Sequence, residues 1–456
     1  MPDQQLDKYL TENADRFTRE LQELLRIPSI STDPARKDAM LQTAEFVRDS
    51  LARLGFESSV RPTDLHPVVY GELISDPALP TLLVYGHYDV QPPEPLELWE
   101  TDPFDPVIRD GKIWARGASD DKGQFFAHIK GVEAALASRG KLPVNLKFLI
   151  EGEEEIGSPN LDDYVRDHAE ELKADAVVVS DGAMVGPGVP TLTRSLRGLS
   201  YIEVRIRTAA RDLHSGAYGG AVPNAIHVLS RMLSQLHDEN GRITVPGFYD
   251  DVKELDDADR ELLAKVPFDQ DRFLDQVGVK TSVGEAGRSV LERISTRPTL
   301  DVNGIGGGFQ GEGSKTVIPS TAMAKISCRL VANQDSGKVM DQLEQYLKDL
   351  APAGTQVEVI RLGAAQPAST PAGFPALEAA ANALREVWGR EAVHARTGGT
   401  IPVVNTFQQL LGAPVVLLDM GLETDNLHAP NEHFSVDGYQ RGIHAAALLY
   451  ANYQQD

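Results

Sequence analysis

Short, uninterrupted apolar runs that alternate with helical stretches constrain the fold of this chain more than any other feature. The runs are Val68–Tyr70, Thr81–Tyr85, Val144–Ile150, Ala176–Val179 and Pro414–Leu418. Helical spacing of apolar residues lies between them, as in Phe125–Ala137. Strands that are apolar on both faces are typical of parallel sheets with helices on both sides. We therefore expect an α/β fold with a mostly parallel mixed sheet flanked by helices.

A different pattern interrupts this arrangement in the middle of the chain. Ser200–Arg207 and Ala322–Val331 alternate apolar and polar residues, as half-exposed antiparallel strands do. A long acidic stretch at about 247–280 reads as irregular. The apolar runs return after this interruption. We therefore predict an α/β domain in two parts, with an inserted α+β domain between them: 1–194, 195–364 and 365–456.

The charge balance excludes several classes of partner. The chain has 44 Lys and Arg against 67 Asp and Glu, a formal net charge of −23. Nucleic acids and anionic membranes require clustered basic residues, so neither is expected as a partner. No apolar run approaches the ~18 residues of a membrane span, and the first ten residues do not resemble a signal peptide. The single cysteine, Cys328, fits a reducing compartment, and a cytoplasmic location is expected.

Ionisable residues follow the apolar runs at several places, which is where open α/β sheets build their sites. These segments are Gly86–Asp89, Arg116–Gly123, Glu151–Ser158, Ser180–Gly182 and Asp425–Glu432. Each alone has an ordinary explanation, such as a core histidine, a capped turn or a solvated acidic loop. Together they supply two histidines and at least three carboxylates, enough for two divalent ions that share one carboxylate. Mixed His, Asp and Glu ligation favours Zn²⁺ or Mn²⁺.

The residue types within these segments indicate how such a centre would work. His87 and Asp89 share one face of an extended backbone, so the carboxylate can orient the imidazole. Asp120 and Asp121 repel each other when buried unless a cation compensates their charge. Two neighbouring glutamates of the acidic run could divide the work, one binding metal and the other acting as general base.

The motifs, in their order along the chain, resemble a known family. They are GHYDVQP (Gly86–Pro92), RGASDDKG (Arg116–Gly123), EGEEEIGS (Glu151–Ser158) and SDG (Ser180–Gly182). They are similar to those of the co-catalytic metallopeptidases that include carnosinase, cytosolic non-specific dipeptidase, aminoacylase and succinyl-diaminopimelate desuccinylase. The resemblance spans nearly the whole chain.

This resemblance implies two divalent metal ions per subunit. Asp120 would bridge them, His87 and Asp181 would complete one site, and Glu155 and His428 the other. Glu154 would be the general base, and Asp89 would steady His87. The family also implies a cis peptide bond between Asp120 and Asp121.

The dipeptidase branch of the family is the most similar. Its substrate-side segments resemble Arg211–Gly216, Lys315–Pro319, Cys328–Val331 and Gly398–Pro402. By resemblance, His214 would polarise the scissile carbonyl and Arg329 would hold the substrate carboxylate. Thr316 and Thr400 would add hydrogen bonds. One departure concerns specificity, because a histidine-bearing segment that some dipeptidases carry near Ala368–Phe374 is missing here.

The resemblance also implies a homodimer. The inserted domain would act as lid and dimer contact, and its His214 would reach the site of the neighbouring subunit. Each active site would therefore be completed in trans.

The predicted activity is hydrolysis of dipeptides or similar short peptides with a free C-terminal carboxylate, by a water activated by Glu154. Two alternatives stay open: an N-acyl amino acid deacylase (acetyl or succinyl) with the same centre, and a metal-binding protein without catalysis. Deacylases of the family are typically shorter and lack the acidic stretch at about 247–280. A spare base beside the predicted ligand Glu155 disfavours the non-catalytic reading. Cys328 lies outside every ligand segment, so a cysteine nucleophile is not expected.

Overall fold

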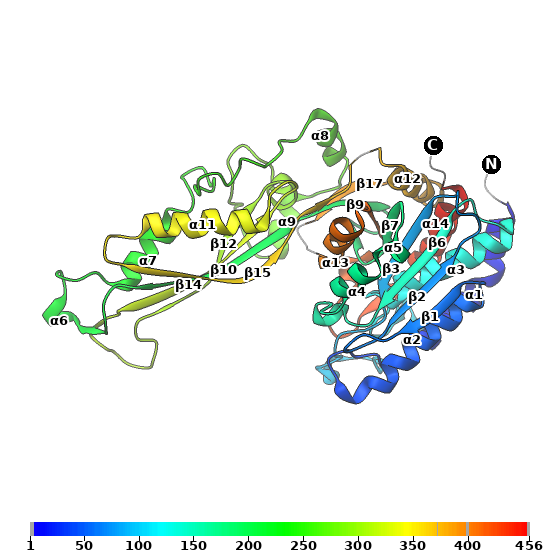
Figure 1. The fold of residues 1–456 in the computed structure, drawn as a ribbon, viewed down its shortest axis with the longest axis horizontal. Coiled ribbons are helices and arrows are strands. Elements are labelled where there is room, and N and C mark those ends of the chain that lie inside the picture. Colours follow the sequence, from blue (N-terminus) through cyan, green and yellow to red (C-terminus); the bar gives the residue numbers. More distant parts are fainter. Residues whose placement is uncertain (1–3, 372, 398–400, 454–456) are drawn as a thin grey trace.

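The computed structural model describes residues 4–371, 373–397 and 401–453. Figure 1 shows two parts, a sheet flanked by helices that carries both ends of the chain and an elongated part built from the middle of the sequence. We call the first part the α/β part and the second the inserted part. This arrangement agrees with the expected fold class.

The α/β part is built on one nine-stranded mixed sheet. Along the sheet the strands are β1 (Glu57–Arg61), β2 (Val68–Leu73), β6 (Asn145–Glu151), β3 (Thr81–His87), β7 (Ala176–Val179), β18 (Val415–Asp419), β9 (Thr191–Leu196) and β16 (Ala368–Ser369), with β17 (Val393–Thr397) also paired to β9. The four central strands, from β6 to β18, are parallel, and the pairs toward both edges are mainly antiparallel. The carboxyl ends of the central strands therefore meet at one edge.

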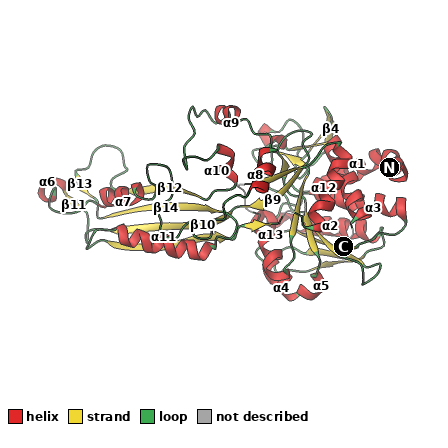
Figure 2. Ribbon diagram, turned by 90° about the horizontal axis from the view of Figure 1, so that it is seen from above, coloured by secondary structure: helices red, strands yellow, loops and turns green. Residues whose placement is uncertain are grey.

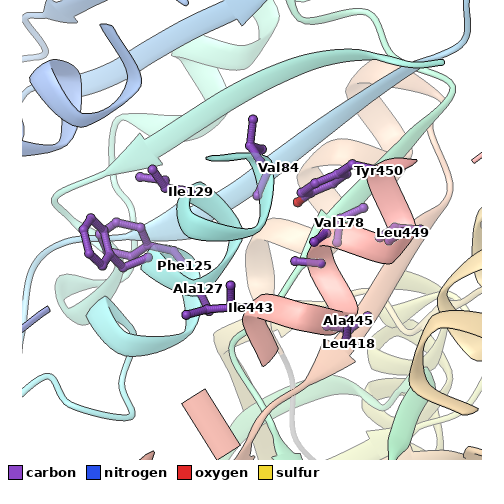
Figure 3. Close-up of a cluster of buried hydrophobic side chains, with 14 of the residues drawn as sticks. Val84, Phe125, Ala127, Ile129, Val178, Leu418, Ile443, Ala445, Leu449 and Tyr450 are labelled. Atoms are coloured by element: carbon purple, nitrogen blue, oxygen red, sulfur yellow. The ribbon is translucent and has the colours of Figure 1, made fainter. Parts of the chain in front are cut away.

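Helices cover both faces of this sheet (Figures 1 and 2). One face packs on α1 (Gln4–Leu25), α2 (Lys37–Ala52), α3 (Lys122–Arg139), α12 (Pro375–Trp388) and α14 (Val436–Asn452). The other face packs on α4 (Leu161–Asp167), α5 (Ala169–Leu172), α13 (Pro402–Thr406) and the π-helix Phe407–Leu411. Val84 belongs to the first cluster (Figure 3). Its neighbours Leu83 and Tyr85 belong to the second cluster, so β3 is apolar on both faces.

The inserted part has its own sheet and its own core. Its four antiparallel strands lie in the order β12 (Thr299–Gly307), β14 (Thr321–Leu330), β10 (Gly198–Arg207) and β15 (Gln356–Ala365). Alternate residues of β14 are buried, as the sequence pattern predicts. They pack with α7 (Ala225–Ser234) and α11 (Ser336–Leu350) into a separate hydrophobic cluster.

The acidic stretch that we expected to be irregular contains two short helices, α8 (Asp257–Ala264) and α9 (Gln270–Gln276). Each begins after an aspartate, Asp256 or Asp269, whose carboxylate accepts a hydrogen bond from the third residue beyond it. This is the usual N-cap arrangement, so the signal for both helices was present in the sequence.

Smaller elements complete the structure. They are β4 (Val107–Arg109), β5 (Lys112–Trp114), β8 (Ala183–Met184), β11 (Leu213–His214), α6 (Ser215–Tyr218), α10 (Val290–Ser295), β13 (Val317–Ile318), β19 (Gly421–Leu422), β20 (His433–Ser435) and the short 3-10 helices 34–36, 96–98, 154–156 and 423–425. Within the described ranges, none of the helices has both the length and the apolar character of a membrane span.

The chain crosses between the two parts twice, at neighbouring positions. β9 of the large sheet continues after one residue into β10 of the small sheet, and β15 returns to β16. Leu196 pairs with Ala368 on one side of this crossing and Leu199 with Ala365 on the other. A Cβ at Gly198 would lie 2.6 Å from the Ala365 carbonyl oxygen, so only glycine allows the two connecting strands to approach this closely.

We predict that Gly131→Ala destabilises the α/β part although alanine is the better helix former. The added methyl would lie 2.6 Å from the Ala446 Cβ, where α3 packs on α14. Overpacking of this kind costs about 1–3 kcal/mol, whereas the gain in helix propensity is about 1 kcal/mol. Urea denaturation should therefore show a free energy of unfolding lower by up to about 2 kcal/mol.

Gly363→Ala is the control, because no atom lies within 4 Å of its added Cβ. It should change the free energy of unfolding by less than about 0.5 kcal/mol. Equal or greater stability of Gly131→Ala relative to wild type would contradict the close approach of the two helices.

Candidate metal centre

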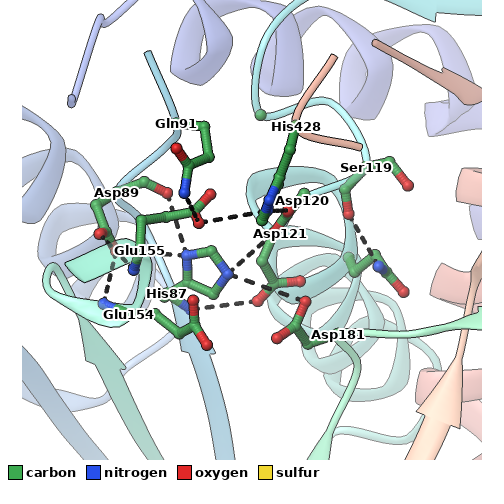
Figure 4. Close-up of polar contacts among 12 residues, drawn as sticks. His87, Asp89, Gln91, Ser119, Asp120, Asp121, Glu154, Glu155, Asp181 and His428 are labelled. Atoms are coloured by element: carbon green, nitrogen blue, oxygen red, sulfur yellow. Dashed lines mark hydrogen bonds and ion pairs between the residues drawn. The ribbon is translucent and has the colours of Figure 1, made fainter. Parts of the chain in front are cut away.

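The carboxyl ends of the central parallel strands carry the ionisable residues that the motifs indicated. His87 is the last residue of β3, and Asp181 follows β7 by two residues. Glu155 follows β6 within the 3-10 helix Glu154–Ile156. Because these strands are parallel neighbours, the three side chains lie at the same edge of the sheet (Figure 4).

Two groups of potential ligands share Asp120. His87 Nε2 lies 3.1 Å from Asp120 Oδ1 and 3.9 Å from Asp181 Oδ1. His428 Nε2 lies 2.9 Å from Asp120 Oδ2 and 3.4 Å from Glu155 Oε2. In each group, one donor atom per residue lies within 4.8 Å of the others, close enough to hold a metal ion. Asp120 offers a different oxygen to each group.

The segment before α3 presents Asp120 from a buried turn. The peptide bond between Asp120 and Asp121 is cis, as the resemblance implied. Asp121 is buried and accepts a hydrogen bond from the backbone N–H of His87 at 3.2 Å. The two aspartates therefore point to different partners, Asp120 to the histidine side chains and Asp121 to the backbone of β3.

Asp89 contacts more of the site than we predicted. The His87 Nδ1 atom lies 3.4 Å from the Asp89 carboxylate and 3.1 Å from the Asp89 backbone oxygen. The same carboxylate accepts hydrogen bonds from the backbone N–H groups of Glu154 and Glu155, at 3.2 and 3.0 Å. One buried side chain thus orients the histidine and also fixes the backbone of both glutamates.

The donor set fits divalent cations. His87 Nε2 is buried and, among the described residues, has no hydrogen-bond partner of adequate alignment. It points to the space between Asp120 and Asp181 (Figure 4). A buried imidazole nitrogen facing two carboxylates, with a third carboxylate and a second imidazole beyond them, matches the mixed nitrogen and oxygen ligation of transition-metal and zinc sites.

The pKa shifts of the residues at this edge show that several carboxylates lie close together. Burial is the main cause that raises the pKa of Glu154 to about 7 and that of Glu155 to about 8, and neighbouring carboxylates contribute to both shifts. Burial opposes a charge on His87, but Asp120, Asp181 and Asp89 outweigh it and raise its pKa well above the usual value. Crowding therefore favours the protonated forms of Glu154 and Glu155, whereas the two imidazoles lower the pKa of Asp120, and a bound cation would relieve the repulsion between the carboxylates.

Glu154 differs from Glu155 in its surroundings. Only Glu155 belongs to a potential ligand group, and it also accepts a hydrogen bond from Gln91 Nε2 at 2.7 Å. Figure 4 shows the Glu154 carboxylate beside the His87 ring. The two neighbouring glutamates thus differ in position, Glu155 within a potential ligand group and Glu154 next to it, and the predicted division of their roles stays a prediction.

The substrate-side residues are spread over the inserted part. His214 is exposed and precedes α6, which lies at the end of the inserted part farthest from the sheet edge (Figure 1). Thr316 is close to it, since Ser215 donates a backbone hydrogen bond to the Thr316 oxygen at 3.1 Å. Arg329 is half-buried and pairs with Leu199, beside the crossing between the two parts. Thr400 lies outside the described residues.

The orientation of His214 is defined by a backbone contact. Its Nδ1 accepts a hydrogen bond from the Gly216 N–H at 3.0 Å. In the neutral ring the proton is therefore on Nε2, which faces away from this contact and is able to donate.

Sequence reasoning missed two side chains of the site. Gln91 continues the period of two set by His87 and Asp89, so alternation alone would have placed it on the same face. Glu432, four residues after His428, is fully buried and bonds to the segment that carries Asp120. Its signal was weaker, because an acidic residue in a polar loop is usually solvated.

Comparison with known proteins gives consistent matches. The Cys-Gly metallodipeptidase DUG1 of Candida albicans is 35% identical, over 97% of this chain and 95% of that protein. The human Beta-Ala-His dipeptidase is 32% identical, over 98% of this chain and 92% of that protein. The solved structure of the M20 family metallo-carboxypeptidase Sso-CP2 from Sulfolobus solfataricus superposes with a TM-score of 0.80 at 35% identity, covering 96% of this chain and 99% of that one.

The family model for peptidases M20/M25/M40 matches residues 83–452. This range contains every residue of both potential ligand groups. It also contains the whole inserted part and both strands that connect it to the large sheet. The chain belongs to peptidase family M20/M25/M40.

Proposed function

We propose that this chain is a metal-dependent dipeptidase that hydrolyses dipeptides or similar short peptides with a free C-terminal carboxylate. The observation that carries the proposal is the pair of ligand groups joined by Asp120, with the carboxylate of Glu154 next to them. Full-length relatives at 32–35% identity that are named as dipeptidases support the substrate class.

The two groups would hold two divalent cations, with Zn²⁺ or Mn²⁺ favoured by the ligand chemistry. His87 and Asp181 would bind one, Glu155 and His428 the other, and Asp120 both. Cations bound there would polarise the scissile carbonyl and lower the pKa of a water molecule in the site.

The side chains of the centre would move the proton. Glu154 would accept a proton from the attacking water and deliver it to the leaving amine. Asp89 would hold His87 and the backbone of Glu154 in place, since its carboxylate contacts both. The peptide bond would be cleaved without an acyl-enzyme, because the nucleophile is water.

The inserted domain, which we assign to residues 195–364, would bind the substrate. Arg329 would pair with the C-terminal carboxylate through its planar guanidinium, and Thr316 and Thr400 would add hydrogen bonds. His214 would donate a hydrogen bond from its Nε2–H to the carbonyl oxygen and so stabilise the negative charge that develops there.

We further propose a homodimer in which His214 of the partner subunit completes each site. His214 directly precedes α6, which Figure 1 shows at the far end of the inserted part, and this supports action on a second subunit. A cytoplasmic location belongs to the same proposal, supported by a chain whose single cysteine, Cys328, is buried and free.

The test is a substrate panel on the metal-free chain reloaded with Zn²⁺ or Mn²⁺. It should contain Cys-Gly, β-Ala-His, longer peptides, and N-acetyl and N-succinyl amino acids. Hydrolysis of dipeptides with the highest kcat/KM supports the proposal. Preference for the N-acyl amino acids would instead indicate the deacylase alternative, and turnover of none would contradict both.

Glu154→Gln should lower kcat by about 10²–10⁴-fold and keep the metal content, because it removes the base and leaves the ligands. Glu155→Gln should lose metal, which elemental analysis of the dialysed protein measures. Wild-type turnover by Glu154→Gln, or full metal content in Glu155→Gln, would refute this division of roles.

Arg329→Ala should lower kcat/KM about 10–100-fold for dipeptides with a free carboxylate, because it removes a charge-assisted hydrogen bond. C-terminally amidated dipeptides should be affected far less. Arg205→Ala is the control, since Arg205 is exposed on the neighbouring strand β10. An equal loss of kcat/KM for both substrate types would show that Arg329 does not bind the substrate carboxylate.

Mixing of two inactive variants tests the dimer. Glu154→Ala and His214→Ala homodimers should each be nearly inactive, but a hybrid has one intact site and one doubly damaged site if His214 acts in trans. With random exchange, activity should recover to about a quarter of wild type. If mass spectrometry detects hybrids and activity stays absent, His214 acts within its own subunit.

A further inference from the structure

Glu432 is a buried carboxylate that neither potential ligand group contains. Its residue is 0% exposed, and its two oxygens accept four hydrogen bonds. Oε2 accepts from Arg116 Nη1 at 2.8 Å and from the Gly117 N–H at 2.9 Å. Oε1 accepts from the backbone N–H groups of Ser119 at 2.9 Å and of Asp120 at 3.1 Å.

Three of these four donors are backbone groups of the segment that presents Asp120. The last donor is the backbone N–H of Asp120 itself, so Glu432 bonds directly to the residue that both potential ligand groups share. Gly117 has a φ of +83°, which lets the segment turn so that its N–H groups point to one carboxylate.

The backbone around Glu432 is fixed to the same segment. β20 pairs with β5, His433 opposite Trp114, and the Ala115 N–H donates to the Glu432 backbone oxygen at 3.1 Å. The backbone of Glu432 therefore extends the pairing of β20 with β5 by one residue, up to the start of the turn that carries Asp120. It comes four residues after His428, so one loop supplies a ligand and holds another.

Stability alone is a poor explanation for this carboxylate. Buried ion pairs such as Arg116–Glu432 contribute little net stability, because both charges lose their hydration. Burial of one more carboxylate beside Asp120 adds repulsion. A group that fixes the backbone of a metal ligand, however, has a clear effect on the affinity of the site.

We propose that Glu432 is a positioning residue of the metal centre, which presets the turn Arg116–Asp120 so that Asp120 faces both ligand groups before metal binds. This inference rests on the proposed metal-dependent function. It assigns Glu432 no contact with metal or substrate, and its effect passes through Asp120.

Glutamine is a sharp probe of this role. Each carboxylate oxygen of Glu432 accepts two hydrogen bonds. In glutamine an NH₂ group replaces one of these oxygens, and because NH₂ is itself a donor, the two N–H groups that face it lose their acceptor. Neither orientation of the amide avoids this conflict. The side-chain volume stays nearly the same, so the substitution changes hydrogen bonding rather than packing.

The experiment titrates Mn²⁺ alone into the metal-free, full-length chain by isothermal titration calorimetry. Glu432→Gln should bind Mn²⁺ about 10–100-fold more weakly than wild type, the usual effect of losing a group that supports a ligand. At saturating Mn²⁺, kcat should recover toward wild type, unlike that of Glu154→Gln. An affinity within about threefold of wild type would overturn the proposal.

Glu285→Gln is the matched control. This carboxylate also receives several hydrogen bonds from arginines, Arg297 and Arg242, but it lies in the inserted part. It should change Mn²⁺ affinity less than about threefold, whatever its effect on stability. An equal loss of affinity in both variants would reduce Glu432 to a general structural role and refute the proposal.

Hydrogen exchange tests the same idea without a variant. In the metal-free wild type, the amides of Gly117, Ser119 and Asp120 should exchange slowly, because Glu432 holds them in the absence of metal. Rapid exchange of these amides that becomes slow only with Mn²⁺ would overturn presetting by Glu432. If wild type binds Mn²⁺ but hydrolyses no peptide, the proposed function fails, whereas the affinity and exchange measurements still decide the role of Glu432.

Discussion

Repulsion among carboxylates at the carboxyl edge of the sheet is the constraint on which the rest of the structure depends. The central parallel strands deliver His87, Asp181 and the acidic run after β6 to one place, and the turn before α3 adds Asp120. Such crowding is unfavourable unless positive charge and backbone N–H groups oppose it. Asp89 and Glu432 add further negative charge, and backbone N–H groups of the ligand segments donate hydrogen bonds to both, the N–H of Glu155 to Asp89 and that of Asp120 to Glu432.

The positions of the predicted substrate-side residues in the inserted part constrain how a substrate could be bound. Arg329 lies beside the crossing strands, whereas His214 and Thr316 lie together at the remote end. A substrate that contacted all three within one subunit would have to span the whole small sheet. Contacts from two subunits remove this difficulty, so assembly and catalysis are linked in the function that we propose.

The sequence was sufficient to predict the fold class, because the patterns that indicate it lie within single short segments of the chain. Uninterrupted apolar runs marked β3, β6, β7 and β18, and strict alternation marked β14. The sequence did not predict the strand β9, because its segment TLTRSL is mostly polar although all six residues are buried. Its polar groups are satisfied across the sheet, as when Thr193 Oγ1 donates to Asp419 at 2.6 Å, and no local pattern announces such a partner.

The same distinction applies to the site. The ligand segments were visible because each places ionisable residues after an apolar run, and the structure brings His87, Asp120, Asp181, Glu155 and His428 together. Their roles stay predictions. Glu432 and Gln91 were missed because their importance lies in contacts with residues 312 and 64 positions away, although the period of two already places Gln91 on the face of His87 and Asp89. Long-range hydrogen bonds have no signature in composition or spacing.

The paired crossing strands have a consequence for how such a chain is organised. Leu196 and Ala368 are paired neighbours on the large sheet, although the whole inserted part lies between them in sequence. If that part were excised, a short turn would join β9 to β16 as an ordinary hairpin, and the order of the other strands would not change. The small sheet is thus a modular extension of one hairpin, free to vary in size while the frame that holds the ligands stays the same.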